Sequence, residues 1–341
     1  MNASPVLTDL EFHLLNDWQR GFPLTSRPYA ALARRLGCGE REVIETLAAL
    51  KARGHVSRIG AVFRPHVLGA STLAALACPP GRIEAVARQV NTYPEINHNY
   101  EREHDYNLWF VVVAPSRERV SAVLADIHRE SGLQPLDLPM VADYHIDLGF
   151  ELAAGDRPAP RAHLDAAGDP VDVDRLRACL DPVDYTLAAA LEGGLTFTLS
   201  PFAAVAAACG MAESTCLARI ERLLSLSVMR RFGVVVRHRE LGYTANAMVV
   251  WNVSDVRVRQ VGRYLATQPG VTLCYQRPRR LPDWPYNLFS MVHGRDRAAV
   301  LQEVARLRQE LELDESVCRP LFSVRRFKQC GARYAVQAKV A

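Results

Sequence analysis

The sequence lacks several features that would identify common classes of protein. It contains no run of about 18 apolar residues, so no membrane-spanning helix is expected. Its first residues, MNASPVLTDLEF, show no basic stretch followed by an apolar core, so no secretory signal is expected. Its eight cysteines include no C-x-x-C pair, which argues against a zinc or iron–sulfur site and favours free thiols in the cytoplasm. The net charge of +4 permits anionic ligands but does not by itself indicate a nucleic-acid binder.

The chain does contain two copies of one pattern. The aligned stretches are RIGAVFRPHVLG (58–69) with RFGVVVRHRELG (231–242), NYER (99–102) with CYQR (274–277), and YNLWF (106–110) with YNLFS (286–290). The last two pairs belong to polar, aromatic segments that we call the first tip (97–112) and the second tip (274–294). The second tip is longer and richer in Arg. Between the copies lies a segment rich in Ala, Pro, Gly and Asp, which is typical of a linker.

Each copy divides into a helical part and a part that alternates strand and helix. In the helical part of the first copy, PYAALARRLG and EREVIETLAALK predict two short helices around a Gly turn, and GHVSRIGAVF predicts a β-wing. The other part reads strand, helix, strand, strand, helix, strand, with one closing strand over residues 138–150 in the first copy. The expected fold class is α+β, a tandem repeat of a winged helix-turn-helix and a ferredoxin-like βαββαβ domain. The expected domains are 1–62 (winged helix-turn-helix, copy 1), 63–152 (ferredoxin-like, copy 1), 153–172 (linker), 173–238 (winged helix-turn-helix, copy 2) and 239–341 (ferredoxin-like, copy 2).

The helical parts have few of the side chains that a DNA reader needs. A recognition helix uses Lys and Arg to neutralise phosphates and to reach base edges. Residues 211–228 of the second copy contain only Arg219 and Arg222 as basic residues, and the corresponding stretch of the first copy mixes Glu with Arg. A transcriptional regulator therefore stays as an alternative that the residues disfavour.

Taken together, these motifs resemble known proteins over essentially the whole chain. A winged helix-turn-helix followed by a βαββαβ unit resembles the Lrp/AsnC regulators. The two tips look like the signatures of the sirohaem decarboxylase family, which has an Lrp/AsnC-like fold and occurs as paired subunits or as a fusion of the two.

The resemblance implies a carboxy-lyase that removes CO2 from the C12 and C18 acetate side chains of sirohaem to give 12,18-didecarboxysirohaem. That product feeds haem d1 or an alternative route to haem, and the fused form points to the haem d1 pathway of denitrifiers. No cofactor beyond the iron-tetrapyrrole substrate is implied. The implied partners are sirohaem, its decarboxylated products, and a homologous subunit pair or self-association; neither DNA nor a membrane is expected.

The residues fit this chemistry on independent grounds, because a flat macrocycle fringed with carboxylates needs aromatic walls, Arg side chains and a proton donor. The candidate substrate-binding residues are Arg102, Asn107, Trp109, Arg277, Arg279, Arg280, Trp284, Tyr286, Arg325 and Arg326. The candidate catalytic residues are His98, His104, Tyr100 and Tyr275, and His98 is also a candidate axial ligand of the substrate iron. Further candidates are His238, His293, Arg64, Arg237 and Lys328.

Simpler roles remain open for several of these residues. The Tyr and Asn residues that both copies share could shape the hairpins, and the Arg residues of the second tip could form a solvated face. Copy 1 has Asp147 where copy 2 has a basic residue, so the halves are not expected to contribute equally. We expect the second tip to bind carboxylates and the first tip to reach iron or supply a proton, with the reverse assignment open. A haem-binding carrier without catalysis is a further alternative.

Overall fold

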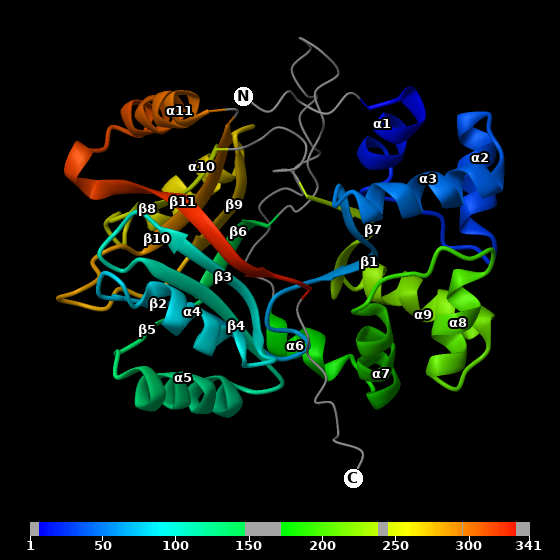
Figure 1. Ribbon diagram of the computed structural model, residues 1–341, viewed down its shortest axis with the longest axis horizontal. Helices are drawn as coiled ribbons and strands as arrows, with labels where there is room; N and C mark the ends of the chain where they lie inside the picture. Colours follow the sequence, from blue (N-terminus) through cyan, green and yellow to red (C-terminus); the bar gives the residue numbers. More distant parts are fainter. Residues whose placement is uncertain (1–6, 147–171, 238–244, 295, 332–341) are drawn as a thin grey trace. The chain divides into compact units, whose positions relative to one another are not determined.

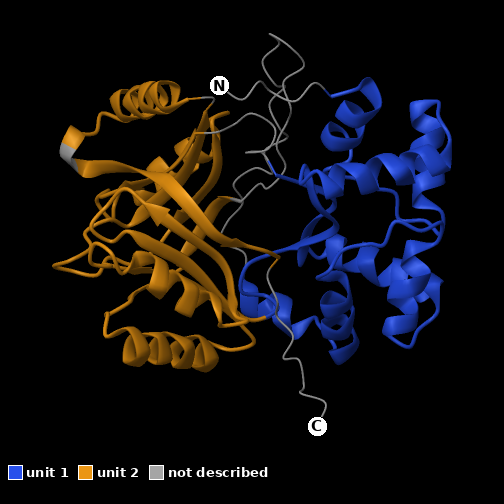
Figure 2. Ribbon diagram, viewed as in Figure 1, with its two compact units in different colours: residues 1–68, 149–162, 172–242 blue, residues 69–148, 163–171, 243–341 orange. Residues whose placement is uncertain are grey.

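The computed structural model describes residues 7–146, 172–237, 245–294 and 296–331, and they form two compact units (Figure 2). Each unit combines segments of both sequence copies. The first unit gives way to the second at residues 68/69, whereas the sequence analysis placed this boundary at 62/63; the predicted boundary at 238/239 lies outside the described residues. The expected boundary at 62/63 falls inside a strand, β1, because the apolar pattern continues through it. Asp147, His238 and the expected linker up to residue 171 lie outside the described residues.

The first unit contains the helical parts of both copies. Its elements are α1 (Asp9–Asn16), α2 (Pro28–Leu36), α3 (Glu40–Ala52), β1 (Val56–Phe63), α6 (Val173–Ala178), α7 (Pro182–Leu191), α8 (Pro201–Ala208), α9 (Glu213–Ser225) and β7 (Met229–Val236). The helix-turn-helix pairs are α2–α3 and α8–α9. As expected, α2 stops at Gly37, which adopts a left-handed conformation (φ 68°) that glycine tolerates without strain.

The strands expected to form a wing in each copy instead pair with each other. β1 and β7 run antiparallel, with Gly60 opposite Gly233. Gly233 also lies against the backbone after α1, where a Cβ atom would come within 2.3 Å of the carbonyl oxygen of Gln19. Apolar side chains of both copies, including Leu47 and Phe202, form one shared core beside this ribbon. The helical parts therefore fold as one body made from two copies.

The second unit contains a single nine-stranded sheet. Its elements are β2 (Ala70–Leu76), α4 (Ile83–Asn91), β3 (Ile96–Arg102), β4 (Leu108–Ala114), α5 (Arg117–Ser131), β5 (Leu136–Pro139), β6 (Ala142–Ile146), β8 (Ala245–Trp251), α10 (Val258–Ala266), β9 (Val271–Gln276), β10 (Leu288–Gly294), α11 (Arg297–Glu310), the 3-10 turn η2 (Glu315–Val317) and β11 (Cys318–Gln329). The strand order is β5-β2-β4-β3-β11-β8-β10-β9-β6. Each copy thus has the predicted βαββαβ order, and the copies join where β11, the long red strand of Figure 1, runs beside β3.

The closing strand of the first copy differs from the prediction. Instead of one strand over residues 138–150, the chain forms β5, which pairs with β2 of its own copy, and β6, which pairs with β9 of the other copy. Because β5 and β6 are the two end strands of the sheet and only Met140 and Val141 separate them, the sheet has to curve until its ends meet. The three Cα–Cα steps from Pro139, the end of β5, to Ala142, the start of β6, span at most about 11 Å.

Three apolar clusters show which face of the sheet each side chain occupies. One holds side chains of the first copy around α4 and α5, and one holds side chains of the second copy around α10 and α11. The third cluster combines both copies and includes Leu73, Trp109, Tyr275 and Phe289. We call the face that bears this third cluster the inner face, and the face covered by the helices the outer face.

Candidate active site

Several of the predicted site residues share the inner face because of strand alternation. On β4, Trp109 belongs to the inner cluster and Phe110 to the outer one. In the β3–β4 ladder Tyr100 lies opposite Trp109, whereas Asn99 lies opposite Phe110 and hydrogen-bonds to α4. Cross-strand partners point to the same face of a sheet. The inner-face side chains of β3 are therefore His98, Tyr100 and Arg102.

The inner face bears two arginines at equivalent positions of the two copies, Arg102 at the end of β3 and Arg277 directly after β9. Arg102 donates from Nη1 to the carbonyl oxygen of Leu321 at 3.0 Å, and its guanidinium lies 5.7 Å from the ring centroid of Tyr100. Arg277 donates from Nη1 to the carbonyl oxygen of Leu138, and its guanidinium lies 4.5 Å from the ring centroid of Tyr275. Each arginine thus stacks on the Tyr two residues before it and bonds to a backbone carbonyl of the other copy.

Neither arginine forms an ion pair with a carboxylate of the described residues. Arg102 is 8% exposed, and its burial lowers its pKa to about 10. Burial also lowers the pKa of Arg277, whose Nε is buried without a hydrogen-bond partner although the residue as a whole is partly exposed. A buried cation without a counter-charge is costly, so this arrangement is suited to an anionic ligand.

The two tips meet around Trp284, which is fully buried. Its ring centroid lies 5.1 Å from that of Trp109, 5.0 Å from that of Tyr286, and 5.4 Å from that of His104. The indole Nε1 of Trp284 is buried without a hydrogen-bond partner. This aromatic group supplies the flat, apolar surface that a macrocycle requires.

His104 is held at this group with a defined tautomer. Its Nδ1 accepts a hydrogen bond from the backbone N–H of Tyr106 at 3.0 Å, which places the proton of the neutral ring on Nε2. Burial lowers the pKa of His104, so the neutral form dominates near pH 7. In this state Nε2–H is a hydrogen-bond donor and has no lone pair for a metal.

The two halves of the inner face differ in charge. On β3, His98 follows the same face as Tyr100, and its ring stacks on Tyr100 with an interplanar angle of 18°. Arg326 of β11 lies opposite Tyr100. At the equivalent position of the second copy, Asp143 of β6 lies opposite Tyr275. The imidazole and the additional cation thus belong to the half that contains β3.

Comparisons with known proteins agree with this arrangement. Residues 68–145 and 240–328 match the family described as AsnC-like ligand binding domain, and residues 11–56 match the Siroheme decarboxylase NirDL-like HTH domain. The chain is 45% identical over 333 residues to the Siroheme decarboxylase NirDL subunit of Paracoccus denitrificans, covering 97% of this chain and 98% of that protein. The chain belongs to the sirohaem decarboxylase family.

Two further relatives bear on the site and on the duplication. The crystal structure of the siroheme decarboxylase NirDL in co-complex with iron-uroporphyrin III analogue superposes with a TM-score of 0.66 at 27% identity, covering 96% of this chain and 93% of that one. The Siroheme decarboxylase NirD subunit of Stutzerimonas stutzeri is 52% identical over 143 residues, which is 42% of this chain and 94% of that protein. The NirD subunit thus corresponds to less than half of this sirohaem decarboxylase chain.

The structure brings most of the predicted residues together but assigns protein partners to others. Arg279 is held in its own copy by Asn252, Asp255 and two backbone carbonyls. Arg325 lies on the outer face, where it forms ion pairs with Glu84 and Glu101. Because these contacts already engage both guanidinium groups, a substrate carboxylate would have to displace them.

Three more predicted residues have clear structural contacts. Asn107 forms two hydrogen bonds with the backbone of Cys78, just after β2. Its Oδ1 accepts from the N–H of Cys78 and its Nδ2 donates to the carbonyl oxygen, each at 2.9 Å. This is the hairpin-shaping role that the sequence analysis left open. Arg280 is exposed and donates to the carbonyl oxygen of Asp137 at 2.8 Å. His293 lies near the end of β10, on the same face as Phe289.

Sequence reasoning missed Asp143. It reaches the inner face only because β6 pairs with a strand of the other copy. No local pattern in the sequence reveals such long-range pairing, although the charge at this position could have drawn attention to it. The candidates Arg64 and Arg237 belong to the first unit, whereas Lys328 caps the end of α4 by donating to the carbonyl oxygens of Asn91 and Tyr93.

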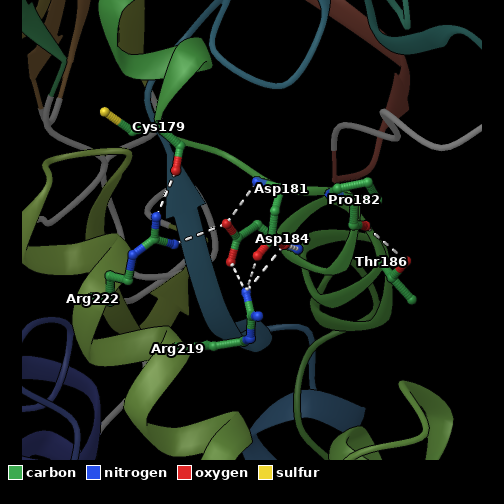
Figure 3. Close-up of polar contacts among 7 residues, drawn as sticks. All are labelled: Cys179, Asp181, Pro182, Asp184, Thr186, Arg219 and Arg222. Carbon is green, nitrogen blue, oxygen red and sulfur yellow. Dashed lines mark hydrogen bonds and ion pairs between the residues drawn. The ribbon is translucent and has the colours of Figure 1, made fainter.

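The helix-turn-helix of the second copy has its two basic side chains in internal ion pairs (Figure 3). Arg219 Nη1 lies 2.9 Å from Asp181 and 2.8 Å from Asp184, and Arg222 Nη1 lies 2.9 Å from Asp184. Asp184 is completely buried. Both guanidinium groups of α9 are therefore occupied by Asp184 of α7 and by Asp181, which precedes α7, and this leaves little positive charge for a phosphate backbone.

Two searches of the described residues concern metals and membranes. They contain no group of three or more His, Cys, Asp or Glu side chains that could hold a metal ion. No single helix among them is long and apolar enough to cross a membrane; α8 and α9 pass that test of length and composition only as a pair, with a bend of 91° between them. All eight cysteines are free thiols.

Proposed function

We propose that this chain is a sirohaem decarboxylase that removes CO2 from the C12 and C18 acetate side chains and forms 12,18-didecarboxysirohaem for haem d1 biosynthesis in the cytoplasm. The relatives carry the name sirohaem decarboxylase, and one of them binds an iron-uroporphyrin III analogue. The observation in this chain that carries the proposal is the pair Arg102 and Arg277, two inner-face cations without a carboxylate partner beside a cluster of aromatic rings.

The arginines would bind carboxylates that do not react. Arg pairs with carboxylates through two parallel hydrogen bonds and stays charged at working pH, even where burial lowers the pKa of Arg102 to about 10. Binding would supply the missing counter-charge, and the ring system would stack among Trp109, Trp284 and Tyr286. Arg102 and Arg277 occupy equivalent positions in the two copies, which suits a substrate whose carboxylates point in opposite directions.

The reaction needs one proton for each CO2 released. When the bond between the acetate CH2 and its carboxylate breaks, the electron pair stays on the CH2 carbon and is conjugated with the pyrrole ring. A proton must then reach that carbon to form the methyl group. His104 is the proposed donor in its protonated form: taking up a proton on Nδ1 breaks the hydrogen bond from the N–H of Tyr106, and transfer of the Nε2 proton to the carbon leaves the ring neutral. Tyr100 and Tyr275 are hydroxyl donors on the same face. No cofactor beyond the iron-tetrapyrrole substrate enters this scheme.

His98 is the proposed iron ligand. Nδ1 of His104 is already occupied by the N–H of Tyr106, which keeps its Nε2 protonated, whereas His98 lies at mid-strand on the inner face, stacked on Tyr100. A neutral imidazole is a common axial ligand of haem iron. In this scheme both histidines belong to the half that contains β3, whereas the arginines that bind the substrate carboxylates come from both halves.

The regulator alternative would require α9 to contact DNA, and its Arg219 and Arg222 are bound to Asp181 and Asp184. The carrier alternative would use the same arginines and aromatic rings but would release the pigment unchanged. The two functions therefore differ in the fate of the pigment and not in its binding.

The test is incubation of the purified chain with sirohaem in the absence of oxygen, followed by mass analysis of the pigment. We expect two successive losses of CO2. Arg102→Gln should weaken pigment binding, and His104→Gln should keep binding and lose turnover. Arg129→Gln, on the exposed side of α5, is the matched control and should behave as the unchanged chain. Bound pigment of unaltered mass would support a carrier and refute the proposal.

A further inference from the structure

The sheet of the second unit contains two junctions between the copies that are equivalent by the internal repeat. In the first junction, residues 323–329 of β11 pair with β3; in the second junction, β6 pairs with β9. Arg326 lies opposite Tyr100 in one, and Asp143 lies opposite Tyr275 in the other. Each incoming strand has a register shift directly after these residues. Phe327 and Tyr144 therefore occupy equivalent bulged positions.

The two junctions differ in the space they offer to the bulged aromatic ring. Tyr144 packs on Gly262 of α10, where a Cβ atom would lie 2.4 Å from its ring. The equivalent residue of α4 is Ala87: Asn99 of β3 donates to the carbonyl oxygen of Ala87, as Cys274 of β9 does to that of Gly262. The absence of a Cβ atom at Gly262 thus leaves room for the ring of Tyr144 in the second junction, whereas Ala87 has a Cβ atom at the equivalent position of the first.

The junctions also differ in charge. In the first junction Arg325 forms ion pairs with Glu84 of α4 and Glu101 of β3. At the equivalent positions of the second copy stand Arg259 and Gln276, and Ala142 lies opposite Gln276. Burial raises the pKa of the Tyr144 hydroxyl, and the charges of Arg259 and Arg263 oppose this shift. At these described positions, the first junction therefore combines a cation of the incoming strand with two carboxylates of the receiving edge, and the second junction has Ala142, Arg259 and Gln276 instead.

These differences predict what would happen if like halves paired. A second-copy strand on a second-copy edge would place Arg325 beside Arg259 and Gln276, where the first junction has Glu84 and Glu101. A first-copy strand on a first-copy edge would place the ring of Tyr144 over Ala87 and leave Glu84 and Glu101 without their cation. Like charges disfavour the first arrangement, and the loss of the ion pairs and of the space that Gly262 leaves for the ring of Tyr144 disfavours the second.

We propose that these side chains enforce pairing of unlike halves: the β3 edge accepts the strand of a second-copy half only, and the β9 edge accepts the strand of a first-copy half only. The partner is the complementary half, supplied by the same chain or by another one. Selective pairing matters because both inner-face arginines bond to a carbonyl of the other copy, so a like pair would not rebuild the same face. This inference concerns assembly and stands apart from the proposed chemistry.

The first experiment tests exchange between halves. Two preparations of the full chain carry different C-terminal tags and a protease site within residues 153–172; each is folded, cut, mixed and recovered through one tag. Each tag marks a second-copy half. In the unchanged protein, the recovered fraction should contain equal amounts of tagged second-copy halves and first-copy halves, and the second tag should be absent. Recovery of both tags together would overturn the proposal.

A gain of like pairing is the sharper result. Arg259→Glu with Gln276→Glu gives the β9 edge two carboxylates for Arg325, and we expect co-recovery of the two tags to rise about tenfold or more. Arg308→Glu with Gln302→Glu makes the same change of charge on α11 and is the matched control. A rise that is no larger than that of the control would contradict the proposal.

The second measurement keeps the chain intact. Glu84→Arg with Glu101→Gln gives the β3 edge the charges of the β9 edge and should lower the urea midpoint of the second unit, because Arg325 then faces a cation. Adding Arg325→Ala, which copies Ala142, should restore most of that loss. If the triple variant is no more stable than the double variant, charge does not select the strand.

Discussion

Replacing Arg102 with Met tests whether this buried cation serves ligand binding or stability. The side chain is 8% exposed, its burial lowers its pKa to about 10, and it donates a hydrogen bond to the carbonyl oxygen of Leu321. Met has a similar length, stays apolar and removes the charge. If the arginine exists for a ligand, its loss should affect binding far more than folding.

The magnitude follows from two opposing contributions. Lowering the pKa from an ordinary value of about 12.5 to about 10 costs the folded state roughly 3 kcal/mol for keeping the charge. The charge-assisted hydrogen bond to Leu321 and the stacking on Tyr100 return a total of roughly 2–4 kcal/mol. Because these nearly cancel, we expect the free energy of unfolding to change by about 1 kcal/mol or less. A lost bond to a carboxylate should weaken sirohaem binding about tenfold to a hundredfold.

Urea denaturation followed by tryptophan fluorescence measures the first quantity. Trp109, Trp251 and Trp284 lie in the second unit and Trp18 in the first, so the signal reports mainly on the sheet that contains Arg102. Spectroscopic titration with sirohaem measures the second quantity. The matched control is Arg325→Met, which removes an arginine from the outer face and should leave sirohaem binding unchanged.

Two results would refute this reasoning. A loss of more than about 3 kcal/mol in the free energy of unfolding would show that Arg102 is structural, as when one partner of a buried ion pair is removed. Unchanged sirohaem affinity would show that the guanidinium does not bind the substrate.

Three further predictions concern other parts of the molecule. Burial lowers the pKa of His104 below that of the unfolded chain, so the unfolded state takes up protons first and stability should fall as the pH drops through about 6.5; His104→Gln should flatten this dependence in urea titrations at several pH values. Asp184→Ala leaves Arg219 without its buried partner and should cost the first unit about 3–5 kcal/mol in chemical unfolding, whereas Thr186→Ala in the same helix should cost far less. His98→Ala should change the absorption bands of bound ferric sirohaem, and an unaltered spectrum would contradict iron ligation by His98.

Much of the fold could be predicted from apolar spacing. Val86, Ala87 and Val90 predict the buried face of α4, and these residues are buried. The order of strands and helices in each copy was also correct, because strand and helix periods of 2 and 3.6 residues are local properties. The closing strand of the first copy was wrong for a non-local reason, since β6 leaves its own copy to pair with β9.

The site was only partly predictable. Arg277 and Arg279 are two residues apart in one Arg-rich tip and look alike in the sequence. In the structure, Arg279 is bound by Asn252 and Asp255 of its own copy, whereas Arg277 reaches a backbone carbonyl of the other copy and forms no ion pair with a carboxylate that the structure describes. The same distinction separates Arg102 from Arg325.

By itself, the sequence determined the duplication, the two kinds of domain in each copy, and the chemical inventory of the tips, because all three depend on residue types and short spacings. Only the tertiary structure decided how the copies interlock, which arginines face inward without a counter-charge, and that Asp143 faces Tyr275. These features depend on register between strands more than a hundred residues apart, where moving a strand by one residue turns every side chain to the opposite face.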